Sequence, residues 1–327
     1  MGKMSKYYMG IDTSAYTTSV AVVNEFGEVV FDKRAVLKVK LGERGLRQQE
    51  AVFQHIVNLP EIFDSLCKKI DTTKIKTVSA SVKPRNVEKS YMPVFRVAQG
   101  QAFIISKILN AEYKEFSHQD GHIAAGILGS RLKITKPFLA FHISGGTTEL
   151  LYVEEDTKNY NIKLIGGTKD ISAGQLIDRI GVKLGFNFPC GNEMDFVSKS
   201  GSIINKKLPI NTDGTWINFS GAETFFYKLV EERYYTSNDI SNSLFNCIAN
   251  AIVNIVIQAI KMYDIHDILF IGGVASNSII REVLEEKIVK AQIGNVYFPN
   301  PIYCSDNAIG IAFLGAVKEG ERNFGGL

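Results

Sequence analysis

Short apolar runs alternate with amphipathic stretches along the whole chain. Three strand-like runs open it, at residues 7–11, 19–23 and 29–31, and turn residues between the last two predict a strand-and-hairpin meander. Amphipathic spacing over about residues 46–69 predicts a long helix, which a strand near 78–82 and a helix over about 96–109 follow. This order predicts a mixed α/β domain.

The same pattern restarts near residue 137, with strands predicted at 138–143, 149–154 and 162–165. The strand, small-residue turn and second strand of residues 10–23 have a counterpart in residues 142–153, so the chain looks internally duplicated. Further elements are expected at 174–184, 244–263, 268–271, 278–290 and 307–317. We therefore predict two lobes, residues 1–133 and residues 134–327, the second with an inserted helical segment.

Two α/β domains that each begin with a strand-turn-strand hairpin are the plan of the actin, Hsp70 and sugar-kinase group. The predicted fold is accordingly a two-lobed actin-like ATPase (ASKHA) fold, with duplicated mixed-sheet domains and a ligand cleft between the lobes. Analogy of fold predicts that the cleft binds a ligand, but it does not define the chemistry.

Composition excludes several classes of protein. With 327 residues, 45% hydrophobic and 22% charged, the chain has an ordinary globular composition. A net charge of +3 neither requires nor excludes a nucleic-acid partner. The four cysteines have no paired spacing, which argues against a disulfide framework and favours the cytoplasm. We find no apolar signal core and no apolar stretch of spanning length, so we expect neither export nor a membrane.

Two histidines four residues apart, His118 and His122, form the most informative pair in the sequence. On a helix they lie on one face, where both imidazoles can chelate one metal ion. Two histidines are an incomplete site, because a divalent ion needs at least one more protein ligand. His142, at the end of a predicted strand, is one candidate; the alternative is a hydrogen-bonded core histidine.

Two glycine-containing loops are candidates for nucleotide binding. The turn Ser144-Gly145-Gly146-Thr147 lies between two predicted strands, where glycine lets backbone N–H groups approach an anionic ligand. The loop 272–277, which ends at Asn277, joins a strand to a helix N-terminus, a common phosphate site. A plain tight turn and a helix cap remain the alternatives. Asp178 and Asp195 could accept hydrogen bonds from a ribose or an amide, or be ordinary surface acids.

Seven segments of the chain together resemble the Kae1/TsaD family, also called Gcp or peptidase family M22, whose members make threonylcarbamoyladenosine at position 37 of tRNA. The resemblance spans most of the chain. The matching segments are residues 10–14, 118–123, 143–150, 174–179, 219–221, 272–277 and 304–308.

The resemblance implies a metal-dependent acyltransferase that moves a threonylcarbamoyl group from threonylcarbamoyl-adenylate to N6 of an adenosine in tRNA. It implies His118, His122 and Asp306 as ligands of one divalent metal, with iron favoured and zinc as the alternative, and His142 where archaeal members have a tyrosine ligand. Asp306 would then come from the second lobe. The family's partner proteins are also implied, and no catalytic acid or base is assigned. The adenylate-binding set implied is Ser144, Gly145, Gly146, Thr147, Asp178, Gly191, Asp195 and Asn277.

Three positions depart from the family pattern. Bacterial members have Cys-Asp-Glu where this chain has Ala15-Tyr16-Thr17, and a Gly-Pro-Gly loop where residues 82–86 stand here. Thr147 replaces a histidine that many bacterial members have. These departures leave two alternatives: a diverged paralogue that carbamoylates a small molecule, or a nucleotide-binding partner subunit.

Overall fold

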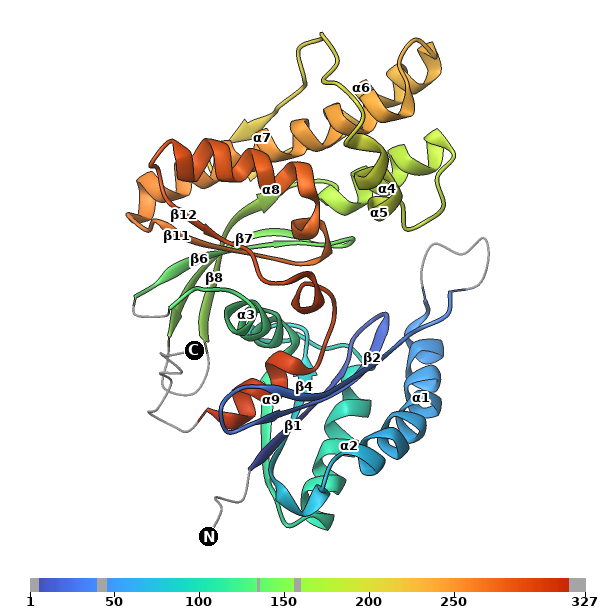
Figure 1. Ribbon diagram of the computed structural model, residues 1–327, viewed down its shortest axis with the longest axis vertical. Coiled ribbons are helices and arrows are strands. Elements are labelled where there is room, and N and C mark those ends of the chain that lie inside the picture. Colours follow the sequence, from blue (N-terminus) through green and yellow to red (C-terminus); the bar gives the residue numbers. More distant parts are fainter. Residues whose placement is uncertain (1–5, 40–45, 134–135, 156–159, 318–327) are drawn as a thin grey trace. The chain divides into compact units, whose positions relative to one another are not determined.

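The computed structural model describes residues 6–39, 46–133, 136–155 and 160–317 of the protein. Its chain divides into two compact units (Figure 1). The first contains the described residues up to 133, residue 160 and residues 305–317, and the second contains residues 136–155 and 161–304. The lobe boundary predicted from the sequence assigns residues 305–317 to the second lobe. They belong instead to the first unit, because the helix α9 (Ile309–Ala316) packs on the sheet of that unit.

The first unit is built on a five-stranded sheet with the strand order β3-β2-β1-β4-β5. Its first three strands form an antiparallel meander, and β4 and β5 continue the sheet in parallel beside β1. Strand β2 is buried along its whole length, as expected for a sheet covered on both faces. The strands are β1 (Tyr7–Thr13), β2 (Thr17–Asn24), β3 (Val29–Val36), β4 (Ile75–Lys83) and β5 (Glu112–Ser117).

The second unit contains a seven-stranded sheet with the order β12-β11-β6-β7-β8-β10-β9. Strand β6 pairs antiparallel with β7 and parallel with β11, and β11 pairs parallel with β12. The order β8-β7-β6-β11-β12 therefore repeats the order β3-β2-β1-β4-β5, which confirms the predicted duplication. The strands are β6 (Phe138–Ile143), β7 (Thr148–Glu155), β8 (Tyr160–Thr168), β9 (Thr212–Asp213), β10 (Trp216–Ile217), β11 (Asp267–Ile271) and β12 (Asn295–Tyr297).

Each unit also has its own helices. The first unit contains α1 (Gln48–Lys69), α2 (Phe95–Ile108), α3 (His118–Leu128) and α9. The second contains α4 (Ala173–Leu184), α5 (Gly191–Ser198), α6 (Ser220–Glu232), α7 (Ser237–Tyr263) and α8 (Ser278–Leu284), the last continued by a π-helical stretch (Glu285–Lys290). Short 3-10 turns lie at Thr72–Lys74, Gly273–Ser276 and Pro301–Tyr303.

The predicted elements agree with the structure to within a few residues, except that β3 ends five residues later and α7 begins seven residues earlier than predicted. We missed β5, α5, α6 and the short strands β9, β10 and β12. Strand β5 was missed because most of its side chains are not buried, so its hydrophobic alternation is weak.

Helix α7 also corrects a prediction made from composition. Its 27 residues are long and apolar enough to cross a membrane, although no stretch of spanning length was expected. Within the second unit, however, 72% of the most apolar 18-residue stretch of this helix is buried. That burial is the pattern of a core helix.

All four cysteines are free, as their spacing predicted.

Candidate functional site

Helix α3 carries the histidine pair, and its first turn is fixed by a capping box. The Ser117 hydroxyl accepts a hydrogen bond from the Asp120 N–H at 3.1 Å, and the Asp120 carboxylate accepts one from the Ser117 N–H at 2.9 Å. The helix therefore starts at His118, and His122 follows one turn later on the same face. The helical spacing on which the chelate prediction depended is confirmed.

Asp306 lies just before α9, and two hydrogen bonds fix this segment. The Ala308 N–H donates to the Ser19 hydroxyl of β2 at 2.9 Å, and the Ile309 N–H donates to the Asn307 side chain at 3.0 Å. Since Asp306 belongs to the same unit as both histidines, the expectation that it comes from the other lobe is wrong. All three residues of the candidate metal site lie in one unit.

Glycines allow α9 to approach α3 and β1 closely. A Cβ added at Gly310 would overlap the backbone carbonyl of Gly121 in α3, and one added at Gly10 would overlap the backbone of α9 at Ala308 and Ala312. Backbone contact at these positions leaves no room for a side chain. This packing brings the start of α9 beside the histidines.

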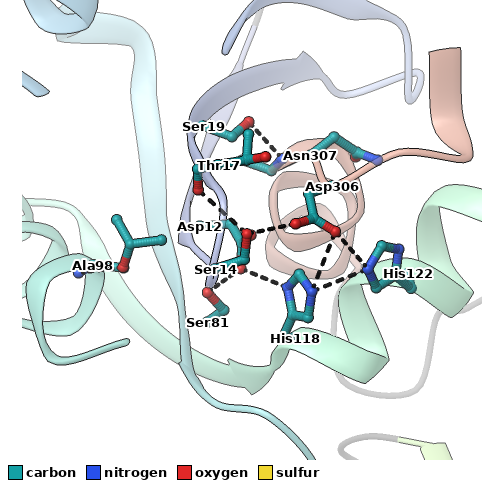
Figure 2. A network of polar contacts seen from close by, with 12 residues as sticks. Asp12, Ser14, Thr17, Ser19, Ser81, Ala98, His118, His122, Asp306 and Asn307 are labelled. Carbon is teal, nitrogen blue, oxygen red and sulfur yellow. Dashed lines mark hydrogen bonds and ion pairs between the residues drawn. The ribbon is translucent and has the colours of Figure 1, made fainter. Parts of the chain in front are cut away.

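Figure 2 shows the Nε2 atoms of both histidines turned toward the Asp306 carboxylate. The two Nε2 atoms are 3.0 Å apart, and Asp306 Oδ1 lies 3.3 Å from His122 Nε2 and 3.7 Å from His118 Nε2. Ligand atoms about 2.0–2.2 Å from one ion are about 3–4 Å from each other. Two imidazoles and one carboxylate suit iron, zinc or manganese. The donor set and its spacing therefore fit one divalent metal ion.

The electrostatics of the trio reflect its mutual contacts. Burial acts to lower the pKa of His118, but the charges of Asp12 and Asp306 and their hydrogen bonds raise this pKa well above its usual value. Burial acts to raise the pKa of Asp306, but hydrogen bonds from His118 and His122 hold this pKa well below its usual range. The carboxylate stays ionised, as a metal ligand requires.

Strand β1 and the turn after it surround the trio with residues that sequence reasoning missed. The Ser14 hydroxyl donates to Asp306 Oδ2 at 2.6 Å, which leaves Oδ1 for the histidines. Asp12 Oδ1 lies 3.0 Å from His118 Nδ1 and also accepts a hydrogen bond from the Ser81 hydroxyl. Asp12 and Ser14 are two positions apart at a strand end, a spacing that could have identified them as a pair.

A buried histidine contacts the backbone of this turn. His55, on α1, is fully buried; its Nε2 lies 2.8 Å from the Ser14 carbonyl and its Nδ1 lies 2.8 Å from the Thr18 hydroxyl. A carbonyl only accepts, so His55 Nε2 carries the proton and Nδ1 accepts from Thr18. His55 thereby holds the backbone of the residue whose side chain contacts Asp306.

The two loops that depart from the family pattern both lie in the first unit. Residues 15–17 form a tight turn, closed by a hydrogen bond of 3.1 Å from the Ser14 N–H to the Thr17 carbonyl. The loop after β4 is fastened to the first turn of α3: Asn86 donates to Asp120 at 2.6 Å, and the Gln119 N–H donates to the Pro84 carbonyl at 3.0 Å. This loop is a fixed neighbour of the histidine helix.

The glycine turn of the second unit packs against the N-terminus of α4. The Ser144 N–H donates to the Thr147 carbonyl at 2.8 Å, and the Ser172 hydroxyl donates to the Gly145 carbonyl at 2.7 Å. Both Gly145 and Gly146 are exposed, and a Cβ added at either would meet nothing within 4 Å. Their backbone is open to an approaching ligand.

Three other predicted adenylate residues have hydrogen-bond partners within the second unit. Asp178 accepts from the Cys190 N–H at 2.8 Å, directly before Gly191 at the start of α5. Asp195 accepts from both the N–H and the hydroxyl of Ser278, and Asn277 caps α8 through the Ile280 N–H. Burial raises the pKa of Asp178. These contacts link α4, α5 and the start of α8.

His142 lies in the second unit, buried at the end of β6 opposite Ile271 of β11. The only His, Cys, Asp or Glu cluster with metal-ligand spacing among the described residues is that of His118, His122 and Asp306. The role of His142 as a fourth ligand stays a prediction, and so does the adenylate-binding role of the second-unit residues.

Solved structures of other proteins share this fold. The chain resembles component A of (R)-2-hydroxyglutaryl-CoA dehydratase from Acidaminococcus fermentans, with a TM-score of 0.57 at 15% identity, over 95% of this chain and 98% of that one. It also resembles T. kodakarensis HypF, with a TM-score of 0.58 at 13% identity, over 97% of this chain and 49% of that one. These likenesses confirm the two-lobed actin-like fold.

Sequence relatives identify the family more closely. Proteins named tRNA N6-adenosine threonylcarbamoyltransferase are 29% identical in Thermotoga neapolitana, over 95% of this chain and 93% of the relative, and 31% identical in Neorickettsia sennetsu, over 93% and 91%. The family model of tRNA N6-adenosine threonylcarbamoyltransferase matches residues 29–313. This chain belongs to the tRNA N6-adenosine threonylcarbamoyltransferase family.

Proposed function

We propose that this protein transfers the threonylcarbamoyl group of threonylcarbamoyl-adenylate to N6 of adenosine 37 in tRNA. Family membership defines the reaction, and one observation of this chain supports it most strongly. His118 Nε2, His122 Nε2 and Asp306 Oδ1 converge within 3.7 Å of one another. A chain that had lost the activity would have no need to retain this complete trio.

The reaction forms one bond and breaks one bond. The adenine N6 amine attacks the threonylcarbamoyl carbonyl carbon, a C–N bond forms, AMP leaves with the electrons of the C–O bond, and the amine gives up a proton. His118, His122 and Asp306 would hold a divalent ion. Such an ion supplies Lewis-acid polarisation of a carbonyl oxygen. Iron and zinc both suit two imidazoles and a carboxylate, and we propose iron on the basis of the resemblance.

We propose that the second unit binds the adenylate portion. Support comes from the parallel strands β6 and β11, whose carboxyl ends lie side by side: a Cβ added at Gly272 would come within 3.0 Å of the His142 ring. Ligands of open α/β sheets bind at the carboxyl ends of the strands. The exposed backbone of Gly145 and Gly146 lies at this edge, where its N–H groups would meet phosphate oxygens.

We also propose that partner proteins dock on helices α1 and α2 of the first unit. Both helices present large apolar side chains to solvent, which is a mark of interaction surfaces. These side chains are Phe53, Ile56, Val57, Phe103, Ile104 and Ile108, all between 49% and 76% exposed. Replacing Phe53 and Ile108 by Glu should abolish partner binding and leave folding intact.

We also propose that the protein is cytoplasmic, because its proposed substrate is tRNA and its four cysteines are free.

The two alternatives have weaker support than the proposed transfer to tRNA. A nucleotide-binding partner subunit would be expected to lose the histidine pair, and here both histidines face Asp306. Carbamoylation of a small molecule rests only on the altered loops at residues 15–17 and 82–86, and the relatives compared share the tRNA-modifying name.

A transfer assay tests the proposed function. The purified full-length protein and its partners are incubated with threonylcarbamoyl-adenylate and unmodified tRNA, and nucleoside mass spectrometry measures threonylcarbamoyladenosine. We expect product with the wild type and a loss of at least about 100-fold with His122→Ala, because a metal ligand is removed. His266→Ala, at an exposed histidine of the second unit, is the matched control. No product with any tRNA, together with carbamoylation of a small molecule, would overturn the proposal.

A further inference from the structure

Asp12 is a buried carboxylate that lies outside the candidate ligand trio. It occupies the end of β1, a central strand paired with β2 on one side and with β4 on the other, and its side chain is fully buried. Removing a carboxylate from water costs several kcal/mol unless partners compensate. Its position therefore needs an explanation.

Both hydrogen bonds of this carboxylate converge on one oxygen. Asp12 Oδ1 accepts from the Ser81 hydroxyl and lies 3.0 Å from His118 Nδ1, whereas Oδ2 has no hydrogen-bond partner in the described part of the chain (Figure 2). Ionised carboxylates accept hydrogen bonds and donate none. The contact with Asp12 therefore requires that His118 Nδ1 carry a proton.

The opposite edge of the same ring faces the other candidate ligands. His118 Nε2 lies 3.0 Å from His122 Nε2 and 3.7 Å from Asp306 Oδ1. A neutral imidazole has one protonated nitrogen, and only the other can coordinate a metal. Because Asp12 holds the proton on Nδ1, the nitrogen left to coordinate a metal is Nε2, which is the atom that faces the other two ligands.

We propose that Asp12 is a positioning residue: it fixes the tautomer and ring orientation of His118 so that Nε2 can bind the metal. The inference rests on the proposed metal centre. Asp12 is not itself a ligand of that ion, because it contacts the edge of the imidazole opposite Nε2. A carboxylate behind a metal-binding histidine also makes the imidazole a stronger donor. Placement on a central strand keeps the carboxylate rigid.

Zinc affinity tests the proposal, measured on the full-length metal-free protein by competition with a chelator. Asp12→Asn should weaken Zn²⁺ binding about 10–100-fold. An asparagine of the same size either offers its N–H to Nδ1, which moves the ring proton to Nε2, or offers its carbonyl without the charge. Ser81→Ala is the matched control, since it removes the other hydrogen bond to the same oxygen and leaves His118 in place; we expect less than about a threefold change.

A second measurement needs no variant. Side-chain ¹⁵N NMR of the zinc-loaded wild type should show His118 with a protonated Nδ1 and a metal-bound Nε2. If the wild type binds no zinc, the metal centre itself is disproved and the inference falls with it. If the wild type binds zinc and Asp12→Asn binds it within threefold, or if Nδ1 is the metal-bound nitrogen, the role of Asp12 alone is overturned.

Discussion

Single hydrogen bonds around the trio determine which atoms are available to a metal. Ser14 occupies Asp306 Oδ2, Asp12 occupies His118 Nδ1, and the remaining atoms, Oδ1 and Nε2, face one another. The histidine pair was predictable from its spacing of four residues. The spacing of Asp12 and Ser14 marks them as a pair at a strand end, but their contacts with His118 and Asp306 span 106 and 292 positions and leave no local pattern that assigns the pair to the site.

We predict that Ser14→Ala weakens the first unit. The buried Ser14 hydroxyl donates a hydrogen bond of 2.6 Å to the charged Asp306 Oδ2. Hydrogen bonds to charged groups contribute about 1.5–3 kcal/mol to stability. The free energy of unfolding of the metal-free protein, from urea titration, should fall by about that amount. Ser200→Ala, at an exposed hydroxyl, should change it by less than about 0.5 kcal/mol. Equal effects of the two substitutions would contradict the role of Ser14.

We also predict a pH dependence that originates at His55. Burial lowers the pKa of His55 below the unfolded value of 6.5, although the Ser14 carbonyl and the Asp12 charge oppose this shift. Between the two pKa values the unfolded chain holds more protons, so this contribution to stability is complete above about pH 6.5 and is lost as the pH falls toward the folded pKa.

Urea unfolding between pH 7.5 and about 5 measures this effect. The wild type should lose stability on acidification more steeply than His55→Gln, by at most about 1.4 kcal/mol per pH unit. The control is His266→Gln, because the pKa of the exposed His266 is raised by its hydrogen bonds to Ile293 and Asp264, which gives the opposite sign. Identical slopes for the wild type and His55→Gln would disprove the assignment.

Close packing of helices α3 and α9 brings the ligands together at the scale of elements. We predict that Gly310→Ala destabilises the protein by about 1–3 kcal/mol and also weakens metal binding, because the new Cβ would overlap the Gly121 carbonyl and push α9 away from α3. Gly121→Ala should cost less, since its Cβ would first meet the flexible end of the Ile311 side chain at 2.9 Å. Thermal melting measures the stability of both variants, and zinc competition measures their metal binding. A larger effect at Gly121 would contradict this packing.

Most long elements followed from hydrophobic periodicity, as α1 illustrates: its buried residues recur every three or four positions. The short strands β9 and β10 have two residues each, too few to show any period. Helix α9 was predicted as an element, but its place in the first unit was not. The packing of α9 on the first sheet depends on long-range contacts, which the local sequence pattern does not encode.

At the scale of the whole molecule, the two predicted binding sites belong to different units. The metal trio belongs to the first unit, and the predicted adenylate residues belong to the second. We expect zinc at 100 times its Kd to stabilise the protein by about 2.7 kcal/mol and to protect the amides of α3 and α9 from hydrogen exchange. AMP should instead protect residues 144–148 and the start of α4. Zinc protection confined to the second unit would contradict this division.

The most direct test of the account relates metal content to transfer. The protein is stripped of metal and titrated with Fe²⁺ or Zn²⁺, and bound metal and threonylcarbamoyladenosine in tRNA are measured on the same samples. We predict that product formation rises in proportion to bound metal and saturates at about one ion per chain, and that His118→Ala neither binds the ion nor forms product. Full transfer by the stripped protein or by His118→Ala would contradict the account.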